Sequence, residues 1–152
     1  MGIRYRAAEA TDFDALAQVW HESALSTEGA APNLPSVEAL RSRIDREIDA
    51  GWVVTVALDR GEIIGFLALK PAVAVLDQLF ILPSHHGLGI GHALLDAAKS
   101  AMPGGFTLRT ISANHKARRF YELSGLLLLE AGLHPTSGCP VCYYGWNGKP
   151  SS

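Results

Sequence analysis

The segment that most constrains the fold of this chain is a strand followed by a glycine loop and a helix. An apolar run, Leu79–Leu82, ends at Pro83, glycines follow at positions 87, 89 and 91, and a helical pattern continues through Leu95. A helix N-terminus offers unpaired backbone N–H groups and a partial positive charge, and glycines let the backbone approach a phosphate closely. The segment therefore predicts an anion-binding loop, and a molecule that carries a pyrophosphate is its natural ligand.

The spacing of these glycines does not fit the two common nucleotide-binding motifs. The dinucleotide fingerprint Gly-x-Gly-x-x-Gly fails, because His92 or Leu94 stands at its last position. A P-loop requires Gly-Lys-Ser/Thr, and no lysine directly follows these glycines. A nucleotide-binding α/β domain is therefore disfavoured. A glycine-rich helix start without a ligand stays open, since a glycine loop alone is a weak motif.

The rest of the chain changes between helical and strand periodicities. Thr11 and Ser36 are the expected N-caps of two early helices, and Asn114 is the expected N-cap of a late one. Strands are predicted at 3–7, 52–58, 63–69, 73–82, 106–111, 126–131 and 141–146, and a helix at 92–102. The order β-α-α-β-β-β-α-β-α-β-β predicts an α/β (α+β) fold with a mixed sheet and helices on both faces. We expect a single domain over residues 1–148 and a short tail at 149–152.

Composition limits the kinds of partner that the chain can bind and the cellular compartment expected for it. The 152 residues include 13 Lys and Arg against 15 Asp and Glu, so no field of one sign favours nucleic acid or a membrane surface. No apolar run reaches the roughly 18–20 residues of a membrane span, and the start has no apolar secretory stretch. With two cysteines, a disulfide scaffold is excluded and a cytoplasmic location is expected.

A metal site is not expected. Cys139 and Cys142 form a Cys-x-x-Cys pair, and His134 is near in sequence, but no fourth ligand is evident. His85 and His86 are adjacent, so their side chains diverge. Residues three apart on a strand also face opposite sides, which argues against a shared ion or a redox pair.

Two spaced motifs in the second half of the chain carry a family resemblance. Residues His86–Gly91 read His-Gly-Leu-Gly-Ile-Gly, and Asn114–Leu126 hold Asn, Ala, Phe-Tyr and Gly at regular spacings. They resemble the Gln/Arg-x-x-Gly-x-Gly/Ala and Asn-x-x-Ala-x-x-Phe-Tyr-x-x-x-Gly-Phe motifs of the GNAT superfamily of N-acyltransferases. His86 stands where Gln or Arg is usual. The predicted order of elements is also similar to the GNAT fold.

The resemblance implies an N-acetyltransferase that moves acetyl from acetyl-CoA directly to an amine. It implies that backbone N–H groups hold the pyrophosphate, at His86, Gly87, Leu88, Gly89, Ile90 and Gly91. The pantetheine arm would pair with the strand edge at Leu79, Phe80 and Ile81. Asn114 resembles the position that contacts this arm; its alternative role is a plain helix cap, and both roles are compatible because an N-cap uses only part of the amide. The basic residues Lys116, Arg118 and Arg119 form a solvated helix face or a contact to the CoA 3′-phosphate.

The reaction also needs an acid, a base and an acceptor pocket. Tyr121 resembles the family's general acid, because a phenol is still protonated at pH 7, and its alternative is aromatic packing. Asp77 is a candidate base, because a carboxylate in an apolar strand is costly unless it is used or paired. Alternative bases are His21 and Glu22, and the acceptor pocket is expected to include Trp20, His21 and Ser23.

The acceptor is expected to be a small-molecule or peptide amine whose identity cannot be read from the chain. A homodimer is usual among similar proteins. The second hypothesis is a catalytically idle acyl-CoA-binding or regulatory module on the same fold, and the presence of Tyr121 favours the enzyme.

Overall fold

A seven-stranded sheet with the order β1-β2-β3-β4-β5-β7-β6 forms the centre of the structure. The computed structural model describes residues 2–30 and 34–148; Met1, residues 31–33 and the predicted tail at 149–152 lie outside the described residues. The strands are β1 Arg4–Ala7, β2 Val53–Asp59, β3 Glu62–Lys70, β4 Val75–Ile81, β5 Phe106–Ile111, β6 Leu127–Leu133 and β7 Pro140–Trp146. Neighbouring strands are antiparallel except β4 and β5, which are parallel.

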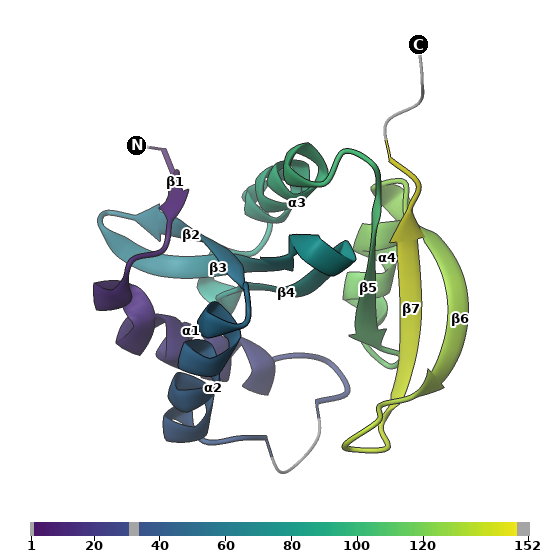
Figure 1. The fold of residues 1–152 in the computed structure, drawn as a ribbon, viewed down its shortest axis with the longest axis horizontal. Coiled ribbons are helices and arrows are strands. Elements are labelled where there is room, and N and C mark those ends of the chain that lie inside the picture. The colour runs from purple at the N-terminus through teal and green to yellow at the C-terminus, as the bar shows by residue number, and fades with distance from the viewer. Residues whose placement is uncertain (1, 31–33, 149–152) are drawn as a thin grey trace.

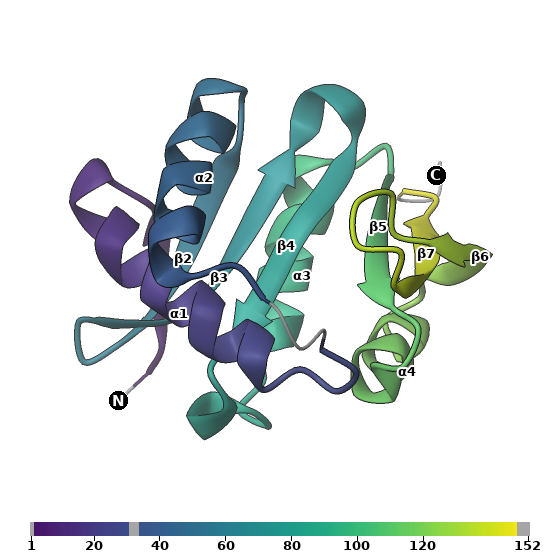
Figure 2. The same ribbon diagram turned by 90° about the horizontal axis from the view of Figure 1, so that it is seen from below.

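Helices cover both faces of the sheet (Figures 1 and 2). The helices are α1 Phe13–Leu25, α2 Val37–Asp49, α3 Ile90–Ala101 and α4 His115–Leu123. α1 and α2 bury one apolar cluster against β2 and β3, while α3 and α4 share the cluster on the other face. The predicted order of elements and the mixed sheet are confirmed.

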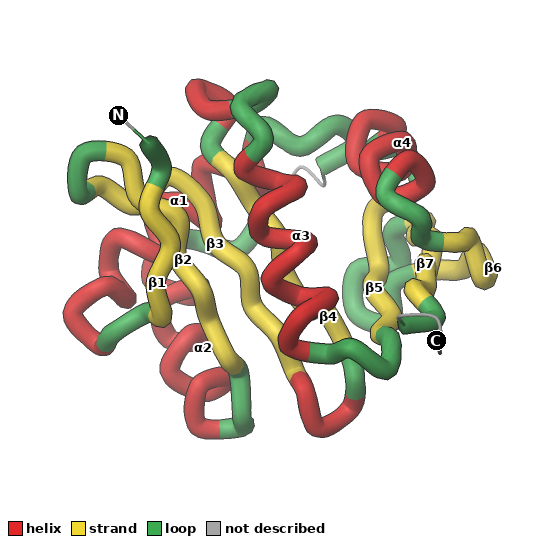
Figure 3. Tube along the Cα trace, turned by 90° about the horizontal axis from the view of Figure 1, so that it is seen from above, coloured by secondary structure: helices red, strands yellow, loops and turns green. Residues whose placement is uncertain are grey.

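The sheet opens between β4 and β5. Their pairing register contains a single residue pair, Val75 with Thr107, and the Thr107 N–H donates to the Ala74 carbonyl at 3.0 Å. Beyond that pair the two strands diverge, as Figure 3 shows from above. A register shift between β3 and β4 leaves Asp77 without a partner residue on β3, and such a bulge increases the local twist. The edge of β4 that faces β5 is therefore unpaired over most of its length.

Several expected boundaries were wrong, among them the end of β6, which lies at Leu133 rather than at residue 131. Thr11 is not the N-cap of α1, because Ala10–Asp12 form a 3-10 turn in which the Asp12 carboxylate accepts the Glu9 N–H at 2.7 Å. β4 begins at Val75 rather than at residue 73, since a second 3-10 turn ends in Ala74 with a positive φ of 55°. α3 begins at Ile90, two residues before the predicted start.

The Ser36 and Asn114 caps are confirmed. The Ser36 hydroxyl accepts the Ala39 N–H at 3.1 Å, and Asn114 Oδ1 accepts the Ala117 N–H at 3.2 Å. None of the helices in the described part of the chain is both long enough and apolar enough to cross a membrane.

Candidate active site

The glycine loop leaves a run of backbone donors without partners. The backbone N–H groups of residues 87–92 donate to no acceptor among residues 2–30 and 34–148. The next N–H along the chain, that of Ala93, donates to the Gly89 carbonyl at 3.1 Å. These donors precede and open α3, where the helix dipole adds partial positive charge. The loop can therefore bind an anion.

The glycines of the loop serve two separate needs. Gly87 and Gly89 both have a φ of +81°, which only glycine adopts readily, and a Cβ at either would meet nothing within 4 Å. The space above them is open to a ligand. Gly91 instead allows close packing, because its Cβ would lie 3.3 Å from Phe120 and 3.4 Å from Ile81.

His86 links the loop to α4. Its Nε2 lies 2.9 Å from the Ile81 carbonyl, and its Nδ1 lies 3.0 Å from Lys116 Nζ. A carbonyl accepts only and an ammonium donates only, so the two contacts are both hydrogen bonds in the tautomer that carries its proton on Nε2. Lys116 is thereby held beside the glycine loop. Sequence reasoning grouped Lys116 with a solvated face and missed this contact, which joins residues 30 positions apart.

His85 anchors the start of the loop to a distant turn. Its Nε2 lies 2.8 Å from the Asp59 carboxylate at the β2–β3 turn, and its Nδ1 lies 2.8 Å from the Ser84 hydroxyl. No local pattern in the sequence signals this pair.

On α4, Tyr121 and Phe120 occupy different environments. Tyr121 is only 7% exposed and packs with Phe120 and Tyr144 at ring centroid distances of 5.3 and 6.1 Å. Burial raises the pKa of the Tyr121 hydroxyl above its ordinary value, so the phenol keeps its proton at neutral pH. Phe120 is half-buried and packs against the His92 ring at 5.0 Å.

The strand residues predicted to hold the pantetheine arm lie at the opening of the sheet. On one side Leu79, Phe80 and Ile81 pair with β3, opposite Leu67, Phe66 and Gly65. Their other edge faces the gap beside β5, where the described strands form no pair. An extended chain can add to such an edge through backbone hydrogen bonds.

Asp77 lies on the α1–α2 side of β4 and is paired. Its Oδ2 accepts the Trp52 Nε1–H at 2.9 Å and lies 3.8 Å from Lys70 Nζ. The other carboxylate oxygen, Oδ1, has no hydrogen bond within the described chain. Its proposed role as a base stays a prediction.

The residues predicted for the acceptor pocket lie near the end of α1 and differ in burial. Trp20 is 4% exposed and packs against Trp52 and Phe66 at 5.6 and 5.9 Å. Ser23 is buried, and its hydroxyl has no partner in the parts of the chain that are described. His21 is half-buried. Their contact with an acceptor stays a prediction.

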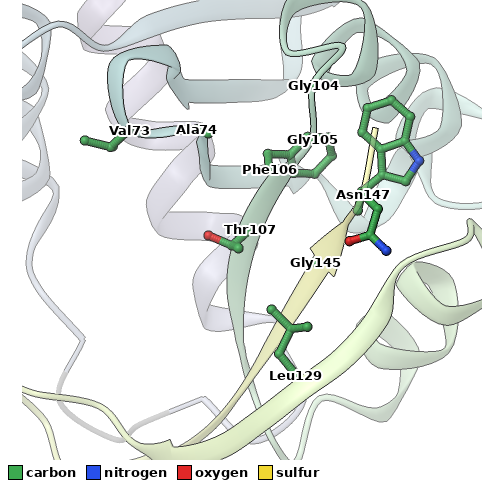
Figure 4. Close-up of a pocket in the computed structure, with 10 residues that line it drawn as sticks. Val73, Ala74, Gly104, Gly105, Phe106, Thr107, Leu129, Gly145 and Asn147 are labelled. Atoms are coloured by element: carbon green, nitrogen blue, oxygen red, sulfur yellow. The ribbon is translucent and has the colours of Figure 1, made fainter. Parts of the chain in front are cut away.

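Two surface pockets lie away from the glycine loop. One of about 370 Å³ lies where β4 and β5 begin, between Val73, Ala74 and Thr107 on one side and Gly145 and Leu129 on the other (Figure 4). Another, of about 410 Å³, lies over the β2–β3 turn. The candidate site is thus the unpaired edge of β4 together with the free N–H groups of the glycine loop, and not an enclosed pocket.

Within the described residues, no group of three or more His, Cys, Asp or Glu side chains is arranged to hold a metal ion. Cys142 is buried, and its Sγ lies 3.2 Å from the Ser112 hydroxyl. His134 Nδ1 accepts the backbone N–H groups of Thr136 and Ser137 at 3.1 and 3.2 Å, which orders the β6–β7 loop.

The chain belongs to the GNAT acetyltransferase family. The family model described as "Acetyltransferase (GNAT) family" matches residues 16–126, which include the glycine loop and α4. An uncharacterized N-acetyltransferase of Bacillus subtilis, YhfO, is 32% identical over 136 residues, which cover 81% of this chain and 89% of that protein.

Solved structures show the same fold. A phosphinothricin acetyltransferase of the GNAT superfamily from Sinorhizobium meliloti, solved with acetyl-CoA, superposes with a TM-score of 0.77 at 19% identity, over 100% of this chain and 95% of that one. The PaiA N-acetyltransferase of Thermoplasma acidophilum, solved with coenzyme A, gives 0.73 at 22% identity, over 94% and 98%. The protein is therefore an acetyltransferase of the GNAT family with the mixed α/β fold of that family.

Proposed function

We propose that this acetyltransferase binds acetyl-CoA along β4 and the glycine loop and transfers the acetyl group directly to an amine. The observation that carries the proposal is the run of unpartnered N–H groups at residues 87–92, which opens α3 beside the unpaired edge of β4. A pyrophosphate fits these donors, and an extended pantetheine arm fits the strand edge.

Several residues of this chain would hold the cofactor. The backbone N–H groups of Gly87–Gly91 would bind the pyrophosphate; the expected His86 N–H instead donates to the Pro83 carbonyl at 3.3 Å, and the His86 side chain holds Lys116, whose positive charge lies beside the loop. Backbone groups of Leu79–Ile81 pair with the arm. Asn114 uses its carbonyl oxygen as the helix cap, which leaves its NH₂ group free to donate.

When bound, the thioester supplies an acetyl group at a carbonyl carbon that an amine can attack. Tyr121 donates a proton to the sulfur as the bond to the acetyl group breaks. Burial raises the pKa of the phenol, so the proton is present at neutral pH when the thiolate develops, but the same shift makes the phenol a weaker acid.

Asp77 is the group that we propose to accept the proton of the incoming amine, directly or through water. An amine of the lysine type has a pKa near ~10.4, so at neutral pH it must lose a proton before it attacks. Asp77 Oδ1 is not used by Trp52 or Lys70 and is free to accept. His21 and Glu22 remain alternative bases.

The burial of Cys142 argues against an acyl-enzyme on that residue, whereas Cys139 is half-buried. A nucleophilic cysteine needs exposure and a nearby base or positive charge to lower its pKa.

The proposal is tested by two measurements on the purified protein. Calorimetric titration with acetyl-CoA reports binding, and a panel of amines assayed for free CoA, with mass spectrometry of the products, reports transfer. We expect binding together with amine-dependent CoA release and an acetylated amine. Binding without release for every amine supports the idle acyl-CoA-binding module instead, and absence of binding contradicts both.

A further inference from the structure

The C-terminal half of the sheet has one uncovered face. Leu108 of β5 is buried in the cluster shared with α3 and α4, whereas Thr107 and Arg109 are exposed on the opposite face. Figure 4 shows Thr107 among the residues of the pocket that Val73 and Ala74 also line. Because α3 and α4 cover the first face, an acceptor has to reach the gap between β4 and β5 from the second.

Two opposite charges flank this gap. Val75 and Thr107 form the last residue pair between β4 and β5, and Asp77 and Arg109 each follow two residues later on their parallel strands. Asp77 bonds to Trp52, which belongs to the cluster under α1 and α2, and Arg109 projects from the uncovered face of β5. Both side chains therefore lie on the side from which the acceptor comes.

The negative charges around this opening are already engaged. Glu47 lies 3.8 Å from Arg43 and 3.4 Å from Lys70, and Lys70 also reaches Asp77. Arg109 has no ion pair and no side-chain hydrogen bond with any residue in the ranges 2–30 and 34–148.

Two further carboxylates are near the opening but do not neutralise Arg109. Glu28 accepts the His115 N–H at 2.9 Å. Glu130 of β6 lies opposite Tyr143, and Tyr143 in turn lies opposite Arg109. The backbones of the two residues are thus two strand spacings apart, or about 10 Å, and no ion pair joins their side chains in the described chain. The positive charge of Arg109 is left without a partner at the mouth of the gap.

Two arginines and a histidine, from three elements, lie around the same space. The Arg43 guanidinium of α2 lies 5.1 Å above the Trp20 ring. Burial is the largest cause that lowers the pKa of His134, in the β6–β7 loop, and the nearby positive charges of Arg109 and Arg43 lower it further. α2, β5 and this loop therefore lie around one opening; the lowered pKa leaves His134 neutral at pH 7 and Arg43 is paired with Glu47, so the unpaired positive charge there is that of Arg109.

This inference rests on the proposed acetyl transfer and names its substrate class. We infer that the acceptor is an amine that also carries an oxyanion, in the first place a carboxylate, and that Arg109 binds the oxyanion while the amino group approaches Asp77. The planar guanidinium offers paired donors that match a carboxylate. The unpaired charge of Arg109 disfavours polyamines and lysine-rich peptides.

The test compares amines that carry an oxyanion with amines that lack one. Free CoA release is measured for amino acids, their carboxamides, their aminophosphonate analogues and spermidine. We expect kcat/KM for the amino acids to exceed that for the carboxamides by about tenfold or more. The aminophosphonates show whether any oxyanion suffices. Equal or higher rates with carboxamides or spermidine overturn the inference and leave acetyl transfer intact.

Arg109→Met is the matching variant, and Arg46→Met, on the exposed face of α2, is its control. Arg109→Met is expected to raise KM for the oxyanion-bearing amines about tenfold or more, with rates on carboxamides and the affinity for acetyl-CoA unchanged. A second readout is calorimetric binding of the amino acids to the CoA complex, which does not depend on turnover. Binding that Arg109→Met does not weaken overturns the inference even where acetyl transfer is observed.

Discussion

Removing one oxygen from Tyr121 separates the roles of acid and packing residue. In Tyr121→Phe the ring keeps its contacts with Phe120 and Tyr144, so we expect the free energy of unfolding to change by less than about 1 kcal/mol. General acid catalysis contributes typically 10²- to 10⁴-fold, so turnover should fall by that factor, which corresponds to about 3–5 kcal/mol of activation free energy.

The assays are free CoA release at saturating acetyl-CoA, calorimetric titration of acetyl-CoA, and urea unfolding. Tyr144→Phe is the matched control, because the Tyr144 hydroxyl donates to Glu122 at 2.5 Å and accepts from Arg118 at 3.1 Å. Its loss leaves a carboxylate short of a donor and should cost about 1–3 kcal/mol of stability while largely sparing turnover. Unchanged turnover in Tyr121→Phe, or a loss of stability as large as that of the control, would refute the assignment.

Three further predictions concern the loop and the N-terminal turn. Gly89→Ala should cost about 1–2 kcal/mol of stability, since its φ is +81°, and should weaken acetyl-CoA binding. Gly104→Ala, where a Cβ meets nothing within 4 Å, is the control, and equal effects would contradict the argument. Lys116→Met should raise the Kd of acetyl-CoA and reduce its salt dependence in titrations at several ionic strengths, and an unchanged salt slope would exclude the phosphate contact. Hydrogen bonding from Arg6 lowers the pKa of Asp12, so this carboxylate stabilises the fold above its unfolded pKa of about 3.9 and loses that effect as pH falls. The stability gap between wild type and Asp12→Asn should therefore shrink from pH 6 to pH 3 in urea unfolding, and a constant gap would contradict this.

The sequence could predict what local patterns determine. The order of elements, the Ser36 and Asn114 caps and the glycine loop depend on neighbouring residues, and the structure confirms them. The Thr11 cap failed for a local reason as well, because the Asp12 carboxylate competes for the same turn and is held there by Arg6.

Most of the missed features join distant parts of the chain. His86 and Lys116 are 30 residues apart, and Trp52 and Asp77 are 25 apart. No periodicity encodes such contacts, which arise only when the strands pair and the helices pack. Arg109 was missed because an exposed arginine in a strand is ordinary. Its position at the mouth of the gap becomes evident only in the structure, where β4 and β5 diverge.

The central claim is that acetyl-CoA occupies the glycine loop and the open edge of β4. Backbone amide chemical shifts of the full-length protein, recorded by NMR during titration with acetyl-CoA, test it most directly. We predict that the largest changes fall on the N–H groups of residues 87–92, with a second set at Leu79–Ile81. Changes confined to another region, such as the pocket beside Thr107 or the β2–β3 turn, would contradict the account.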